Sequence, residues 1–298
     1  MTRGYSSIHM PGEQVYPYAL TNLARVKDRL QINNTDSDTV LIRTINGATD
    51  FIERECGKTG LESYPNDGHF IQKTYTNEVY TAQGRKQERL VLRNAPVTYL
   101  TVTGNLTSGS ANVTVAPYTG IVAGMPLYNI EGLFPQGTTV LTVGSDGALT
   151  MSQPASVTQS GAMFEISGLI SFQWRAGTPS NPNWTSFIQD QFELDQQGRS
   201  GIIRVYGSIP GLYNNMIRAT YVAGYPANFA NAGDGATHQL PTDLTNLCEN
   251  LVVRIFKRRL LDGKASENIQ GATTSWKDRL DAFDLSVIQN YRRVGNIF

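Results

Sequence analysis

Cysteine, histidine and long apolar runs are scarce in this chain of 298 residues, and each scarcity excludes a class of protein. Two cysteines, Cys56 and Cys248, are too few for a disulfide framework; a single disulfide and a pair of small buried thiols both stay open. The three histidines are isolated, and no ligand pair has the spacing of a helix face, so we expect no metal centre. No stretch approaches the roughly 18 apolar residues of a membrane span, and no signal peptide is recognisable, so we expect no membrane partner.

Charge is also sparse. Charged residues make up 17% of the chain and hydrophobic residues 40%, so a packed core is expected and wholesale disorder is not. Lys and Arg together number 25, as do Asp and Glu, so the overall charge gives no sign of nucleic-acid or membrane binding. Lys and Arg are absent between Arg93 and Arg175, where Thr, Ser, Gly and Val predominate. This composition favours β structure with many turns.

Motifs of catalysis are missing. Gly132 and Gly137 have the spacing of a phosphate-binding loop, but the Lys is absent and the segment lies between predicted strands. Gly57-Lys58-Thr59 has the Lys and Thr, yet Ile52 occupies the place of the first glycine. No Gly-x-Ser-x-Gly elbow occurs. We therefore expect no catalytic, cofactor-binding or metal-binding residues, and a protein that is not an enzyme.

Amphipathic helices are predicted near the start of the chain. Residues 1–17 show no periodicity and indicate an extended N-terminal arm. A helix capped by Thr21 is predicted as far as Leu30, because apolar residues recur there at spacings of three and four. A second helix is predicted from about Asp38 to Cys56 on the apolar stripe of Leu41, Ile45, Ala48 and Ile52. Together the two helices predict an antiparallel hairpin.

Strands are predicted in the middle of the chain, in segments with partial or regular alternation. They fall at residues 70–80, 89–93, 95–103, 112–116, 138–143, 148–151, 169–175, 191–195, 202–206 and 215–222. The strands between residues 103 and 167 lie inside the interval that lacks Lys and Arg, and they indicate a compact all-β module.

Helices return at the C-terminal end. Leu240-Pro-Thr-Asp243 has the features of a helix start, and Leu244, Leu247, Leu251 and Ile255 predict its apolar stripe. A last, shorter helix is predicted from Trp276, Leu280, Phe283, Val287 and Tyr291. The fold class expected is therefore α+β: a helical bundle, made of the N-terminal helical hairpin and the C-terminal helices, with an antiparallel sheet and an inserted all-β module.

The C-terminal tail is the candidate interaction site. Residues 251–298 hold nine Lys and Arg against five Asp and Glu. For Arg254 and Arg259 we expect ion pairs within the chain. Tyr291, Arg292, Arg293 and Phe298 combine bidentate donors with apolar area, which is common in interface anchors, so they are the candidate residues for docking on an acidic partner surface.

The order of these elements resembles that of bacteriophage head–tail connector proteins, also called adaptor or head-completion proteins. The resemblance rests on residues 18–30 and 41–56 of the helical hairpin, on Ala95-Pro-Val-Thr-Tyr-Leu100, on residues 217–225, and on residues 240–269 at the end. It implies a connector frame in two parts, residues 18–102 and 168–298, with the inserted all-β module at residues 103–167 and the extended arm at residues 1–17. The module is longer than the family leads us to expect, so its role is not inherited.

The resemblance implies a structural subunit of a twelve-fold ring in the neck of the virion, made in the host cytoplasm. Such a ring binds the portal protein, extends the DNA channel without sequence-specific contact, and gives tail or neck proteins an attachment surface. The competing hypothesis is a virion decoration or receptor-binding protein whose β module contacts host glycans.

Overall fold

The computed structural model describes residues 14–58, 68–81, 88–115, 120–144, 147–176, 178, 181–206, 216–226, 240–259, 266–269, 272–275 and 280–292. The chain divides into two compact units. The helical unit comprises residues 1–61, 228–236 and 240–298, and the β unit comprises residues 62–227 and 237–239. The mixture of helices with antiparallel sheets confirms an α+β protein.

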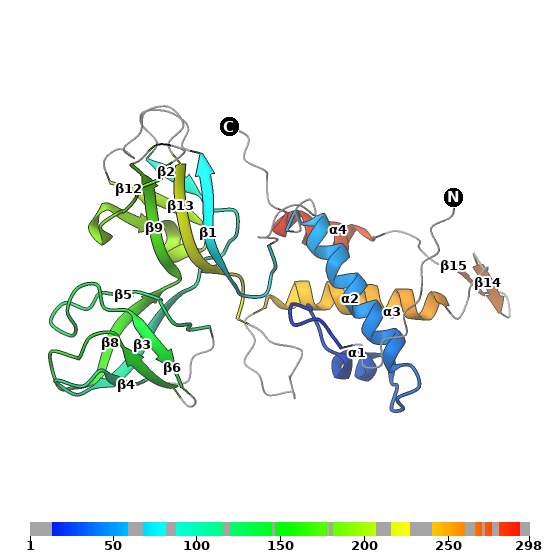
Figure 1. Cartoon of the computed structure of the whole chain (residues 1–298). Helices are drawn as coiled ribbons and strands as arrows, with labels where there is room; N and C mark the ends of the chain where they lie inside the picture. Colours follow the sequence, from blue (N-terminus) through cyan, green and yellow to red (C-terminus); the bar gives the residue numbers. More distant parts are fainter. Residues whose placement is uncertain are drawn as a thin grey trace. The chain divides into compact units, whose positions relative to one another are not determined.

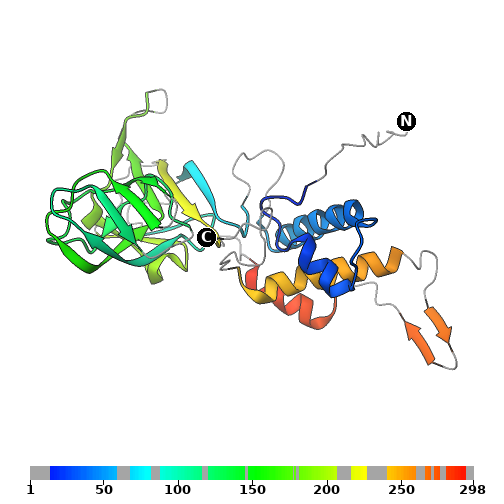
Figure 2. The same ribbon diagram turned by 90° about the horizontal axis from the view of Figure 1, so that it is seen from below.

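The helical unit contains α1 (Leu23–Leu30), α2 (Asp38–Glu55), α3 (Thr242–Arg259) and α4 (Ala282–Tyr291). A two-stranded hairpin of β14 (Ser266–Ile269) and β15 (Ala272–Ser275) lies between α3 and α4 in the sequence. Figure 1 shows α2 crossing α3, and Figure 2 shows α1 and α4 beside α3. The predicted helices are thus confirmed as elements. The last one begins only at Ala282, after Leu280, and Trp276 lies outside the described residues.

The apolar stripe of α2 is buried as predicted: Leu41, Ile45, Ala48 and Ile52 are at most 2% exposed. The stripe predicted for α3 is wrong in its second half. Ile255 is 49% exposed, whereas Cys248 and Val252 are fully buried beside Leu244 and Leu247. The buried face of α3 is rotated because α1, α2 and α4 cover it, and helix periodicity alone does not show where such neighbours lie.

The cap of α1 differs from the prediction by one residue. The Asn22 side chain, not that of Thr21, accepts a hydrogen bond from the backbone N–H of Arg25, at 2.9 Å. Thr21 is fully buried, and its hydroxyl donates to Glu249 Oε1 on α3 at 3.1 Å. Threonine and asparagine can both cap a helix, so the local sequence does not decide between Thr21 and Asn22. The hydroxyl of Thr21 is instead used in the contact with Glu249, which is far away in the sequence.

Within its described residues the β unit holds three antiparallel sheets, each with at least one strand labelled in Figure 1. The six-stranded sheet has the order β5-β8-β3-β4-β7-β6, the four-stranded sheet the order β1-β13-β9-β10, and the three-stranded sheet the order β11-β12-β2. The strands are β1 (Lys73–Thr81), β2 (Arg89–Val91), β3 (Tyr99–Leu106), β4 (Asn112–Val115), β5 (Leu127–Tyr128), β6 (Val140–Val143), β7 (Ala148–Met151), β8 (Gln159–Ser167), β9 (Leu169–Arg175), β10 (Trp184–Ser186), β11 (Phe192–Leu194), β12 (Ile202–Val205) and β13 (Met216–Ala223).

The predicted strands are confirmed, but the strand expected from Ala95 begins only at Tyr99. The segment before it follows a different course: the backbone N–H of Val97 bonds to the Gly198 carbonyl at 2.9 Å, and that of Thr98 bonds to the Val222 carbonyl at 2.9 Å. These bonds join the segment to other parts of the β unit before the regular ladder with β8 begins.

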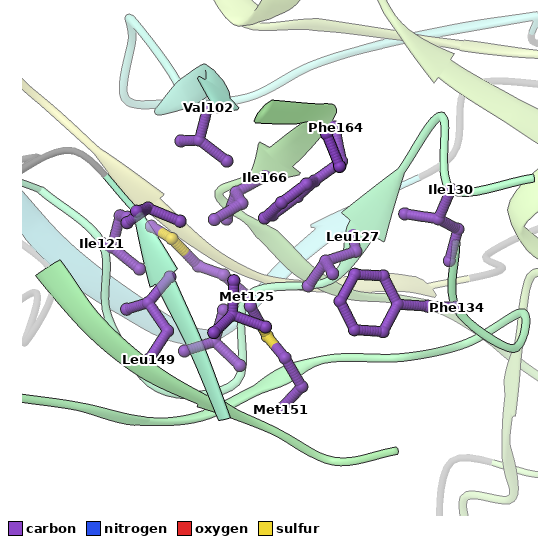
Figure 3. Close-up of a cluster of buried hydrophobic side chains, with 14 of the residues drawn as sticks. Val102, Ile121, Met125, Leu127, Ile130, Phe134, Leu149, Met151, Phe164 and Ile166 are labelled. Atoms are coloured by element: carbon purple, nitrogen blue, oxygen red, sulfur yellow. The ribbon is translucent and has the colours of Figure 1, made fainter. Parts of the chain in front are cut away.

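The six-stranded sheet encloses a core of its own, shown in Figure 3. Alternate residues of its strands point inward, for example Val113 and Val115 on β4, as the period of a half-buried strand requires. The chain enters and leaves this sheet at one place, because the backbone N–H of Gly168 donates to the Thr98 carbonyl at 2.6 Å. A second core lies under the other two sheets, around Tyr75, Leu92, Phe172, Ile203 and Tyr221.

The predicted grouping of residues 18–102 with 168–298 as one connector frame stays a prediction. In the structure, the strands that flank the six-stranded sheet lie with it in the β unit, and the helices form the other unit.

Candidate docking site at the end of α4

The start of α4 is held by two carboxylates. Asp281 is the N-cap, and its side chain accepts from the backbone N–H of Asp284 at 2.9 Å. Asp284 accepts in return from the backbone N–H of Asp281 at 3.1 Å, which completes a capping box. Asp284 is 1% exposed and also pairs with the guanidinium of Arg254 on α3. The expected ion pair of Arg254 is thereby confirmed.

The middle of α4 is packed on the rest of the helical unit. Val287 and Ile288 are buried, and the carbonyl of Ile288 accepts a long hydrogen bond of 3.7 Å from the thiol of Cys56. Burial raises the pKa of Cys56 to about 11, and the nearby cation of Arg292 opposes that shift. Cys56 and Cys248 are both free and buried. Of the two possibilities that the sequence left open, a pair of buried thiols is therefore correct and a single disulfide is wrong.

Tyr291 anchors the end of α4. Its hydroxyl donates to Asp243 Oδ1 at the start of α3, at 2.9 Å. Arg292 follows as the C-cap in an extended conformation, and its side chain is exposed. The candidate residues Arg293 and Phe298 lie outside the described residues. The hydrogen bond to Asp243 thus fixes Tyr291, and with it the position at which Arg292 begins the tail.

Exposed apolar side chains on α3 and α4 were missed by the sequence reasoning. Phe283 is 60% exposed and Leu285 45% exposed on α4, and Ile255 is 49% exposed on α3. The spacing of Phe283 predicted the helix but not which of its sides is buried, and Val287 and Ile288 turn the other side of α4 inward. Singly exposed apolar residues are ordinary on proteins, and these three lie near the start of α4, away from the Tyr291 end from which the tail continues, so they are not part of the candidate docking site.

A buried carboxylate joins the first helix to the third. Glu249 on α3 accepts from Arg25 Nε and from an Arg29 terminal nitrogen, each at 2.8 Å, besides the hydroxyl of Thr21. The Glu249 side chain is 6% exposed, while Arg25 is 34% and Arg29 39% exposed. No local signal in the sequence points to this cluster, because Glu249 is more than two hundred residues away from each of its three partners.

Among the described residues, no group of three or more His, Cys, Asp or Glu is arranged to hold a metal ion. The described helices include none that is long and apolar enough to cross a membrane. The glycines with phosphate-loop spacing, Gly132 and Gly137, both have positive φ and lie in the turns between β5 and β6, with no helix after them. Gly57 ends α2, and the backbone N–H of Lys58 bonds back to the Glu53 carbonyl at 2.8 Å, which is a helix C-terminus.

Comparison with known proteins gives one family. Residues 21–96 match the family described as "Phage gp6-like head-tail connector protein", and no curated protein matches the chain. The matched segment begins at Thr21, includes α1, α2, β1 and β2, and ends at Pro96. The resemblance to phage head–tail connectors is thereby confirmed, and the role that this family indicates is a structural one in the virion.

Proposed function

We propose that the chain is the subunit of a ring in the neck of a phage particle, where it binds the portal, extends the DNA channel and carries the attachment surface for the tail. By the resemblance to connectors, the ring is twelve-fold. The observation that carries this proposal is the family match on the helical hairpin. Glu249 supports extending it to the whole helical unit, because it ties the matched helix α1 to α3, which lies outside the matched segment.

The end of α4 is the proposed portal-docking site. Tyr291 is held by Asp243, so the tail that begins at Arg292 leaves the helical unit from a fixed position. A fixed origin restricts the positions that the following residues can take, which favours docking on a single partner surface. Tyr291, Arg292, Arg293 and Phe298 would supply cationic and aromatic groups to an acidic surface of the portal.

The ring is tested by native mass spectrometry of the purified chain and by its copy number relative to portal protein in purified virions. The expected result is an oligomer, with equal copy numbers of the two proteins in particles. A chain that stays monomeric and is absent from particles would refute the proposal.

The tail is tested by deleting residues 293–298 and replacing Arg292 with Ala, which leaves Tyr291 and its bond to Asp243 in place. We expect weaker binding to portal with an unchanged helical circular dichroism signal. The matched control is Arg199→Ala, which removes an exposed arginine from the β unit. Equal portal binding by the tail variant and the control would contradict docking through the tail.

We further propose that the six-stranded sheet is an insertion that the connector role does not need. Thr98 and Gly168 are joined by a 2.6 Å hydrogen bond, so residues 99–167 can be removed and the two ends linked by a short glycine linker. Head–tail joining should survive in a phage that carries this deletion. Loss of joining would contradict the proposal, and loss of adsorption with joining intact would support a receptor-binding role of the module.

A further inference from the structure

A polar cleft lies within the β unit, between the six-stranded sheet and the segment around β11. It has a volume of about 690 Å³, which falls within the roughly 300–1,000 Å³ of small-molecule sites. Tyr99, Tyr128 and Asn129 line it from the six-stranded sheet, and Asp190, Glu193 and Gln197 line it from the other side.

The polar lining consists of matched groups. Three of the lining residues carry side-chain amides, Asn129, Gln136 and Gln197, and three carry carboxylates, Glu131, Asp190 and Glu193. Lys and Arg are missing from this lining. The aromatic residues are Tyr99, Tyr128 and Phe192, so flat apolar surface stands beside the polar groups.

The floor of the cleft is held in place by hydrogen bonds. Glu165 on β8 accepts from the hydroxyl of Tyr99 and from the amide nitrogen of Asn129, the latter at 2.6 Å. Burial, followed by the hydrogen bond to Glu165, raises the pKa of Tyr99, and burial raises the pKa of Tyr128 to about 12. The Tyr99 proton is committed to Glu165, so the Tyr99 oxygen remains as an acceptor, whereas the neutral Tyr128 keeps its hydroxyl group as a donor.

Two of the amides come from residues with unusual backbone. Asn129 has φ of 52° and Gln197 has φ of 52°, both in the left-handed region that non-glycine residues seldom adopt. Neighbouring Gln196, with φ of 51°, shares that conformation but does not line the cleft. Such a conformation costs free energy and persists only where the surroundings impose it. Here the Gly198 carbonyl, which accepts from the Val97 N–H at 2.9 Å, helps to fix the loop.

We propose that this cleft binds a neutral saccharide. A sugar hydroxyl is both a donor and an acceptor, so a row of hydroxyls can use the amide N–H donors, the carboxylate acceptors and the tyrosine hydroxyls of the lining together. The C–H face of a sugar ring is apolar and matches the flat side of an aromatic ring. This inference does not depend on the connector role, which concerns the helical unit.

The same lining disfavours charged ligands. An anion such as a sialylated sugar or a phosphate would be repelled by the three carboxylates of this lining, which holds no Lys or Arg; the nearby Arg204 on β12, opposite Glu193, is paired with Asp195. A cationic peptide would satisfy the carboxylates, but its guanidinium and ammonium groups are donors only, so the amide N–H groups would have only its backbone carbonyls as acceptors, whereas each sugar hydroxyl both donates and accepts. A neutral polyhydroxylated ligand is the class that uses every group.

The test applies the labelled full-length chain to a printed array of neutral hexose and N-acetylhexosamine oligosaccharides, their sialylated forms and a tri-arginine peptide. The best neutral saccharide is then measured by titration calorimetry against the double variant Asn129→Gly with Gln197→Gly. Glycine accepts positive φ without strain, which offsets part of the loss of the hydrogen bond from Asn129 to Glu165, and the unfolding temperature of the double variant is measured beside its affinity to show that it is folded. Gln196→Gly is the matched control, because it relieves the same strain next to the cleft.

We expect binding of a neutral saccharide by the unaltered chain and by the control, and a loss of about tenfold or more in the double variant, since two hydrogen bonds disappear. Binding of the sialylated forms or of tri-arginine in preference to neutral saccharides would overturn the proposal. So would the absence of neutral saccharide binding on the array, or equal affinity in the double variant and the control.

Discussion

The buried carboxylate of Glu249 predicts an order of stabilities among three variants. Removing the anion by Glu249→Gln leaves Arg25 and Arg29, which are 34% and 39% exposed and regain water easily. Glutamine also keeps an oxygen that accepts from Thr21. We therefore expect a loss of about 2 kcal/mol in the free energy of unfolding, in the range of charge-assisted hydrogen bonds to partly exposed donors.

Removing the cations should cost more. The double variant Arg25→Met with Arg29→Met removes both α1 donors of the Glu249 carboxylate, which is 6% exposed and then keeps only the hydroxyl of Thr21, just before α1, out of these three donors. A buried charge that loses its partners is destabilised by about 3–5 kcal/mol. The prediction specific to a buried carboxylate with partly exposed arginine partners is that the double arginine variant loses more free energy of unfolding than Glu249→Gln does.

Urea unfolding followed by far-ultraviolet circular dichroism measures the effect, because α1 to α4, the α-helices of the described residues, all belong to the helical unit. Arg54→Met is the control. Its ion pair with Glu55 is long, at 3.8 Å, and both side chains are well exposed, so a change below about 1 kcal/mol is expected. If Glu249→Gln proved as costly as the double arginine variant, or costlier, the reasoning from burial would be refuted.

Two further predictions concern the thiols and one glycine. Burial raises the pKa of Cys56 to about 11 and that of Cys248 to about 12, so iodoacetamide at pH 8 should modify neither thiol in the native chain and both in urea, as read by mass spectrometry. These folded-state pKa values lie above the value of 9.0 for an ordinary thiol, so folding favours the protonated thiols. Their contribution to the free energy of unfolding is therefore complete below pH 9 and is lost as the pH rises toward 11 to 12. A free energy of unfolding that increased over this range would contradict the assignment. Gly224 has φ of 106°, and an added Cβ would lie 2.7 Å from the Ile71 carbonyl oxygen, so Gly224→Ala should lower the unfolding temperature of the β unit strongly. Gly109→Ala, at φ of 79° in open space, should cost only about 1 kcal/mol, and equal effects of the two substitutions would show that the close approach is unimportant.

Much of the secondary structure could be predicted because it depends on local patterns. The stripe of Leu41, Ile45, Ala48 and Ile52 has helical spacing, and the alternation at residues 112–116 has strand spacing, so each segment shows its type without reference to the rest of the chain. The family resemblance depended on the order of such segments, and the match at residues 21–96 confirms it.

The candidate site could be predicted only in part. Tyr291 and Arg292 were identified by composition near the C-terminus, but the bond from Tyr291 to Asp243 joins residues of different helices and left no sign in the sequence. The exposure of Phe283 was missed for a similar reason, because periodicity shows that a helix has an apolar side but not which residues its neighbours cover.

The sequence by itself determined the helices α1 to α4 and most of the strands of the β unit, though not β5, β8 or β10, and it marked the stretch without Lys or Arg that contains the six-stranded sheet. Only the tertiary structure decided which residue caps α1, which face of α3 is buried, and which amides and carboxylates meet in the cleft of the β unit. The physical reason is range: spacing and capping act within a few residues, whereas a hydrogen bond such as that from Thr21 to Glu249 exists only after distant segments have packed together.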